Sequence, residues 1–229
     1  MVFGRNKDVD EPAVPVVPWA DTWEFAITDE ERPITEQRRH VVLGARAVRV
    51  PHGRAALKVN APCAFFAPRS PQDSTEALRL YEDAEGRNLL CAVDDPVDAN
   101  GARDYTVRDA QGHVVGTVRR MPPLKHALKP TWRFRQPGRP EIVSSAEWAK
   151  GGVTEMVQKG AGKLLLGAVQ AVADMGAEGG DQPARSRVVE WRADGETVMT
   201  SDAHRRFLIR AAWLDRRVAF AYAMLRTRS

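Results

Sequence analysis

The sequence predicts a mainly β protein, in which an antiparallel meander of hairpins ends in a buried α-helix. Short β-branched runs alternate with glycine-containing turns along most of the 229 residues, which is typical of successive hairpins. Residues 218–225 then form a run without a single charge. A helix that is apolar on every side must be enclosed by protein or lipid. These two patterns together indicate an α+β protein dominated by strands.

The spacing of the turns predicts the individual hairpins. Asp83 and Gly86 bound one turn, and Asp109 and Gly112 bound another, 26 residues further along the chain. An Asp three residues before a Gly suits a turn that the aspartate side chain closes and a left-handed glycine ends. Four hairpins are expected, with strands at 78–81 and 89–93, 105–107 and 114–118, 132–134 followed by a turn at Gly138, and 188–191 and 197–199. Further strands are expected at 41–50, 55–66 and 207–213.

A helical insert is predicted at residues 146–176, because apolar side chains recur there at steps of three and four. Its apolar face includes Val153, Met156, Val157, Leu164 and Leu165. This face could pack on the rest of the domain, meet a partner or lie in a membrane interface, and the sequence leaves the three open. A linker follows at residues 177–185.

The C-terminal helix is predicted at residues 216–225, with Asp215 as its N-cap. The apolar part spans only about 12 Å, which is far short of a bilayer. We therefore expect a central helix buried by the strands, with a core formed by Val218, Phe220, Tyr222, Met224 and Leu225.

The composition, 43% apolar and 28% charged, fits one globular domain. We expect that domain at 38–229, preceded by a proline-rich, acidic arm at 1–37. Pro12, Pro15 and Pro18 favour an extended arm, which we interpret as a tail rather than a strap. No apolar run is long enough for a transmembrane helix, and two cysteines are too few for a disulfide framework, so a cytoplasmic location is expected.

Three stretches resemble the tubby C-terminal-like superfamily, which includes the phospholipid scramblases and the LURP-one-related proteins. They are residues 105–116, the basic run that leads to 132–134, and residues 213–225. The resemblance covers about 78–225, and more weakly 40–66. It implies a β-barrel of roughly twelve strands closed around the C-terminal helix. The excess of arginine over lysine is typical of a high-GC genome, and we interpret the chain as a bacterial member.

An acid-free basic stretch between residues 111 and 140 is the strongest candidate site. Its cations could meet the phosphates of an anionic lipid, with Trp132 and Phe134 at the membrane interface. Alternatively, the arginines pair with acids elsewhere on a solvated face. The candidate ligands of the anionic group are Arg119, Arg120, Lys125, Lys129, Arg133, Arg135 and Arg139. Residues 37–60 are also free of acids and hold six cations.

No motif for nucleophilic or metal-assisted catalysis is present in the sequence, so no catalytic residue, metal or cofactor is predicted. The predicted function is a non-enzymatic membrane- or anionic-lipid-associated binding module of the scramblase/LURP-one type, peripheral at the inner membrane face. The alternative is a protein-interaction or assembly subunit that docks through the helical insert and the arm. A hydrolase without a recognised motif is a third, weaker reading, and nucleic-acid binding is not expected.

Overall fold

The computed structural model describes residues 12–66, 78–122, 131–144, 188–202 and 205–227. These contain thirteen strands, one 3-10 turn (η1) and one α-helix. The strands are β1 (Glu24–Arg32), β2 (Val42–His52), β3 (Val59–Phe66), β4 (Leu78–Tyr81), β5 (Leu89–Val93), β6 (Val97–Ala99), β7 (Ala102–Asp109), β8 (Val114–Met121), β9 (Thr131–Arg135), β10 (Ile142–Ser144), β11 (Val189–Ala193), β12 (Glu196–Ser201) and β13 (Arg206–Ile209). The helix is α3 (Arg216–Thr227), and η1 spans Ala55–Leu57.

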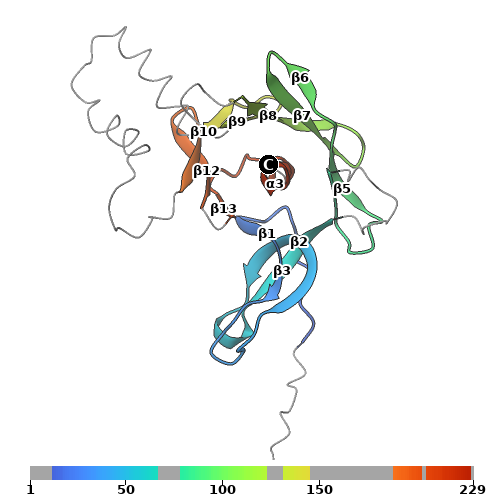
Figure 1. The fold of residues 1–229 in the computed structure, drawn as a ribbon, viewed down its shortest axis with the longest axis vertical. Coiled ribbons are helices and arrows are strands. Elements are labelled where there is room, and N and C mark those ends of the chain that lie inside the picture. Colours follow the sequence, from blue (N-terminus) through green and yellow to red (C-terminus); the bar gives the residue numbers. More distant parts are fainter. Residues whose placement is uncertain (1–11, 67–77, 123–130, 145–187, 203–204, 228–229) are drawn as a thin grey trace, which may run out of the picture.

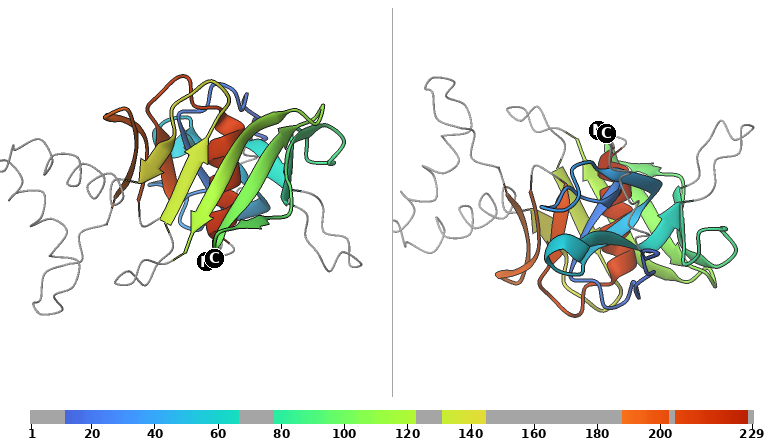
Figure 2. Two further views of the ribbon diagram at one scale, coloured as in Figure 1. Left: turned by 90° about the horizontal axis from the view of Figure 1, so that it is seen from above. Right: turned by 90° about the horizontal axis from the view of Figure 1, so that it is seen from below.

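The strands form a closed antiparallel barrel around α3. Each strand pairs with its neighbour in the order β5-β4-β3-β2-β1-β13-β12-β11-β10-β9-β8-β7, and β5 also pairs with β7, which closes a ring of twelve. Strand β6 pairs only with the first part of β7. Figure 1 looks along α3 and shows the ring of strands around it. In Figure 2 the strands cross the helix obliquely. The predicted mainly β fold and enclosed C-terminal helix are thus confirmed.

All four predicted hairpins are present. They are β4–β5, β7–β8, β9–β10 and β11–β12, each paired antiparallel. The two related turns form as expected, with Asp109 accepting hydrogen bonds from the backbone of Gln111 and His113. Gly86 and Gly112 both adopt a positive φ, of 72° and 83°. The predicted helical insert (146–176) and linker (177–185) lie outside the described residues.

The core follows from alternation on the strands and from the small side chains of the helix. On β9, Trp132 and Phe134 point inward, whereas Arg133 and Arg135 point outward. Helix α3 is buried from Val218 to Leu225, including the predicted Phe220, Tyr222 and Met224. Tyr222 is the centre of an aromatic cluster, with ring centroids 4.8 Å from Trp191, 4.9 Å from Phe134 and 5.6 Å from Trp132. The barrel interior is therefore filled by protein.

Two side chains fix the start of α3. The Asp215 carboxylate accepts a hydrogen bond from the Arg217 backbone N–H at 2.9 Å, which confirms the predicted N-cap. Gln136, in the turn between β9 and β10, accepts from Asp215 N at 2.9 Å and donates to Trp213 O at 3.2 Å. One amide thus joins the barrel wall to the helix start, which sets the depth of the helix in the barrel.

The barrel begins earlier than the predicted boundary at residue 38. Strand β1 lies between β2 and β13, so residues 24–32 are part of the wall and not of the arm. The described residues before β1 form a strap rather than a tail: Val17 N donates to Pro62 O at 3.0 Å, and Trp19 Nε1 donates to Glu82 at 3.0 Å. The indole and the backbone N–H both find partners on the barrel, which holds the strap in place.

Candidate functional site

The predicted basic stretch lies mainly on the outer face of β8 and β9, where acids from neighbouring strands meet it. Arg119 forms a two-pronged ion pair with Asp104 on β7, with N–O distances of 2.6 and 2.8 Å. This hydrogen bonding, with the charge of Asp104, raises the pKa of Arg119 above its ordinary value despite the opposing effect of burial. The charge of Arg119 is therefore paired with Asp104 within the barrel wall.

The remaining described arginines of this stretch are also engaged. Arg133 and Arg135 both approach Glu141, at 3.4 and 2.7 Å. Arg120 lies over the Trp132 ring at 5.7 Å, and Arg139 over the Trp213 ring at 5.8 Å. The stretch contains no acid of its own, but Asp104 and Glu141 neutralise part of its charge in the fold. This is the pairing with acids elsewhere that the sequence analysis gave as the alternative interpretation. Lys125 and Lys129 lie outside the described residues.

The expectation that Trp132 and Phe134 lie at a membrane interface is corrected by the structure. Trp132 is 6% exposed and Phe134 is fully buried, and both pack on Tyr222 inside the barrel. The reason is the alternation of β9, which turns these two side chains inward as it turns the arginines outward. The other predicted interface residues, Val153, Met156, Val157, Leu164 and Leu165, lie outside the described residues.

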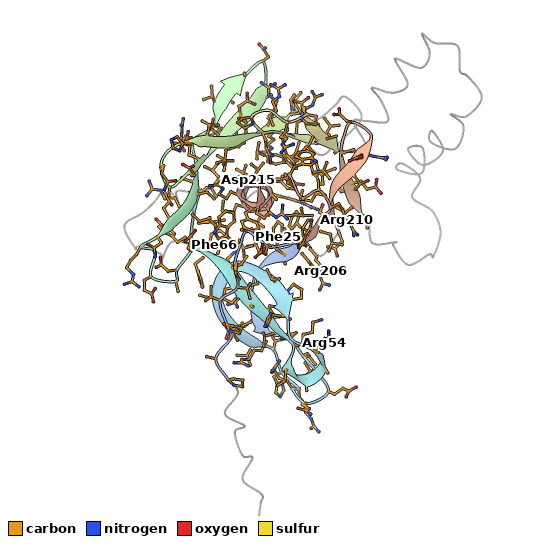
Figure 3. All side chains as sticks on the ribbon, turned by 180° about the vertical axis from the view of Figure 1, so that it is seen from behind. Phe25, Arg54, Phe66, Arg206, Arg210 and Asp215 are labelled. Atoms are coloured by element: carbon orange, nitrogen blue, oxygen red, sulfur yellow. The ribbon has the colours of Figure 1, made fainter. Side chains whose placement is uncertain are left out.

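A second basic surface, which the sequence analysis noted but did not assign, lies on a lobe that projects from the barrel. We define the lobe as residues 29–60, which comprise the end of β1, strand β2, η1 and the start of β3. Figures 1 and 3 show it extending away from α3, with Arg54 near its far end. Strand β2 is irregular in the lobe, because its pairing shifts register against both β1 and β3. The Arg49 guanidinium also donates to the carbonyl of Ala45 at 2.8 Å.

The interior of the lobe contains a polar network. Arg49 is only 2% exposed and donates to Asn60 O at 2.8 Å and to the Glu31 carboxylate at 3.2 Å. Asn60 in turn donates to Glu30 O at 3.0 Å. Gly44 leaves the space that this network needs, because a Cβ there would collide with the Glu31 carboxylate and the Arg49 guanidinium. The network ties β1, β2 and β3 together, beside the buried apolar side chains of Ala47, Val48 and Val59.

The outer surface of the lobe carries the exposed cations Arg39, Arg54 and Lys58. Their side chains form no hydrogen bond or ion pair with another residue in the described part of the chain. His40 and His52 are also exposed there. The signal in the sequence was the absence of any acid between residues 37 and 60. Unlike the arginines of β8 and β9, these cations are available to an external anion.

The two cysteines are free, buried thiols in the barrel wall. Burial raises the pKa of the Cys63 thiol to about 11 and that of Cys91 to about 12. Cys63 borders a hollow of about 380 Å³ beneath the strap, lined also by Glu82 and residues 16–20.

Among the described residues, no group of three or more His, Cys, Asp or Glu side chains could hold a metal ion. In the same part of the chain, no helix has the length and apolarity needed to cross a bilayer.

Comparison with protein-family models, with curated proteins and with solved structures found no match to this chain. The resemblance to the tubby C-terminal-like superfamily therefore stays an inference from three sequence stretches. The closed barrel around a C-terminal helix stands on its own geometry.

Proposed function

We propose that this protein is a non-enzymatic module that binds anionic membrane surfaces, of the kind that the resemblance to scramblase and LURP-one-related proteins implies. One observation carries the proposal: the lobe presents Arg39, Arg54 and Lys58 without partners in the described structure, beside exposed apolar side chains. Cations next to apolar groups suit the boundary between lipid headgroups and acyl chains.

The filled barrel supports recognition on the outside of the molecule. Helix α3 occupies the interior, with its residues from Val218 to Leu225 buried. The lobe, by contrast, stands clear of the barrel and can approach a flat surface (Figure 3). A flat anionic surface therefore fits the shape of the lobe better than a small molecule fits the interior.

The electrostatic binding free energy of the lobe cations is sufficient for reversible attachment to a membrane. Each basic residue near an anionic leaflet contributes about 1 kcal/mol. The three lobe cations would contribute about 3 kcal/mol, or roughly a hundredfold in affinity. The arginines of β8 and β9 contribute less, because Asp104 and Glu141 already neutralise part of their charge. The lobe is the principal contact, and the barrel face is secondary.

The test is flotation of the purified protein with neutral vesicles and with vesicles containing phosphatidylserine, at low and high salt. The wild type should float with anionic vesicles alone and lose binding as salt rises, since screening weakens exposed charges. The variant Arg39→Glu, Arg54→Glu, Lys58→Glu should not float.

A matched control reverses the same number of charges elsewhere, with Arg79→Glu, Arg205→Glu and Arg210→Glu, three exposed arginines outside the lobe. It should float almost as well as the wild type. Absence of flotation for the wild type, or equal loss in both triple variants, would refute the proposal. Salt-independent capture of a protein partner without flotation would instead favour the assembly subunit.

A further inference from the structure

Exposed apolar side chains concentrate on the lobe. Of the ten large hydrophobic residues with high exposure in the described part of the chain, five lie between residues 34 and 57. Ile34 is 63% exposed, Leu43 is 64% exposed and Leu57 is 70% exposed, with Val41 and Val42 beside them. Exposed apolar side chains that gather in one part of a fold commonly mark a place of interaction.

These side chains come from the loop after β1, the start of β2 and η1, which the structure holds together. The Arg38 guanidinium donates to Pro33 O at 2.9 Å and to Lys58 O at 3.2 Å, so it joins the loop after β1 to the turn before β3. Val42 pairs with Arg32 at the end of β1, which places the start of β2 beside the first loop. We call Ile34, Val41, Val42, Leu43 and Leu57 the apolar tip.

Hydrogen bonds of two buried arginines and of one turn fix the backbone beneath the apolar tip. Arg38 is 9% exposed and Arg49 is 2% exposed, and backbone carbonyls accept hydrogen bonds from both guanidinium groups. The turn at residues 35–38 is closed twice, by Thr35 N to Arg38 O at 2.9 Å and by Arg38 N to Thr35 Oγ1 at 3.0 Å. Ile34, Leu43 and Leu57 remain exposed on this support.

Charge complementarity indicates what covers the tip. The exposed cations Arg39, Arg54 and Lys58 lie within three residues of Val41 or Leu57 in the sequence, and Glu36 is the one acid between residues 33 and 58. Apolar side chains bordered by cations match the acyl boundary and the phosphates of an anionic leaflet.

We propose that the apolar tip inserts below the headgroups of an anionic membrane, with the lobe as a preformed wedge and its cations at the phosphates. This inference rests on the proposed function and adds depth to it: Ile34, Leu43 and Leu57 leave water, whereas purely electrostatic attachment would leave them hydrated.

The experiment places an environment-sensitive fluorophore (NBD) on single introduced cysteines, because Cys63 and Cys91 are buried and leave the new thiol as the reactive one. Positions Leu57→Cys and Ile34→Cys report the tip. Val97→Cys on β6 is the control, since Val97 is 66% exposed, close to the 70% of Leu57, but lies outside the lobe. With phosphatidylserine vesicles, the tip labels should shift to the blue and be quenched by nitroxide lipids labelled on the acyl chain. The label at position 97 should stay as in water.

Three further results separate the possibilities. Unshifted tip labels on protein that floats would overturn insertion and leave the proposed function standing, and loss of flotation altogether would overturn both. A concentration-dependent shift without vesicles would overturn insertion in favour of self-association.

The variant Ile34→Ser, Leu43→Ser, Leu57→Ser should keep its unfolding midpoint and lose at least about tenfold in vesicle affinity. Glu36→Lys should strengthen binding several-fold.

Discussion

Arg216 is a buried cation that is surrounded by backbone carbonyls and an aromatic ring. It is 7% exposed at the start of α3, and its guanidinium donates to the carbonyls of Thr22 and Leu214 at 3.0 and 2.6 Å. It also stacks on Trp23 at 4.6 Å from the ring centroid. Burial lowers the pKa of Arg216, an effect that the nearby charges of Asp215 and Asp21 oppose. Carbonyl oxygens replace water around the cation, which makes its burial tolerable.

At the residue scale, the cysteines give a prediction about alkaline stability. Burial raises the pKa of Cys63 from 9.0 to about 11 and that of Cys91 from 9.0 to about 12. In the unfolded chain both thiols ionise near pH 9, whereas in the fold they stay protonated. Their contribution is complete below pH 9 and is lost as the pH rises toward 11 and 12.

The measurement is the thermal unfolding midpoint from pH 8 to pH 11, compared between the wild type and Cys63→Ala, Cys91→Ala. The midpoint of the double variant should fall less steeply with pH. Native protein at pH 8 should also resist iodoacetamide, and denatured protein should react at both positions. Rapid alkylation of the native protein would contradict the burial of the thiols.

At the scale of elements, the packing of α3 on β8 depends on one residue without a side chain. A Cβ at Gly116 would lie 2.6 Å from Val218 Cγ2 and 2.7 Å from the Arg135 carbonyl oxygen. Real Cβ atoms do not approach other atoms so closely, so the glycine lets the helix and strands β8 and β9 come together. The contact lies one turn after the N-cap, where the depth of the helix is set.

We expect Gly116→Ala to destabilise the protein by about 1–3 kcal/mol, the usual range for overpacking a core. Urea unfolding of Gly116→Ala, Val218→Ala and the double variant would measure the coupling between the two positions. The cost of the alanine should shrink in the Val218→Ala background, because half of the collision is removed. Equal costs in both backgrounds would show that helix and strand do not meet at this point.

The elements that the sequence predicted are those with local signals. Each confirmed hairpin has a glycine turn between apolar runs, and α3 has a capping aspartate before an uncharged run. Strand β1 had no such signal, because among residues 24–32 only Phe25 is fully turned into the core and four residues are acidic. Closure of the barrel depends on the pairing of β5 with β7, in which Cys91 lies opposite Asp109. No local sequence pattern predicts this pairing.

The candidate site was predicted less well, for a related reason. Composition identified the cations of residues 119–139 but not their partners, since Asp104 and Glu141 approach only through the register of antiparallel strands. The lobe was visible as an acid-free stretch, yet the register shifts of β2 against β1 and β3 and the hydrogen bonds of Arg49 were not. Such irregular pairing is a property of the folded network and has no sequence period.

At the scale of the whole molecule, the strap joins parts of the barrel that are far apart in sequence. Trp19 donates to Glu82, and Arg217 of α3 lies over its ring at 5.4 Å from the centroid. The strap thereby connects the residues before β1 with the turn after β4 and with the start of the helix. It closes over Cys63, which borders the hollow beneath it.

We expect Trp19→Ala to lower the free energy of unfolding by about 1–2 kcal/mol, because a half-buried ring, its hydrogen bond and its cation contact are lost together. Val16→Ala is the control, since Val16 is 59% exposed in the same strap and should change stability little. Chemical denaturation measures both. If the two variants prove equally stable, the strap is not fastened by Trp19.

The position of α3 at the centre of the barrel also determines when the protein can fold. The wall needs β1 beside β13 and β5 beside β7, and the cavity needs the last described helix to fill it. On the ribosome, every strand is therefore synthesised before the element against which its apolar face will pack. Pairings between such distant segments fold slowly and leave strand edges open in the meantime. The core of the emerging chain stays incomplete until residues 216–227 have left the exit tunnel, so its exposure to chaperones and to aggregation lasts at least that long.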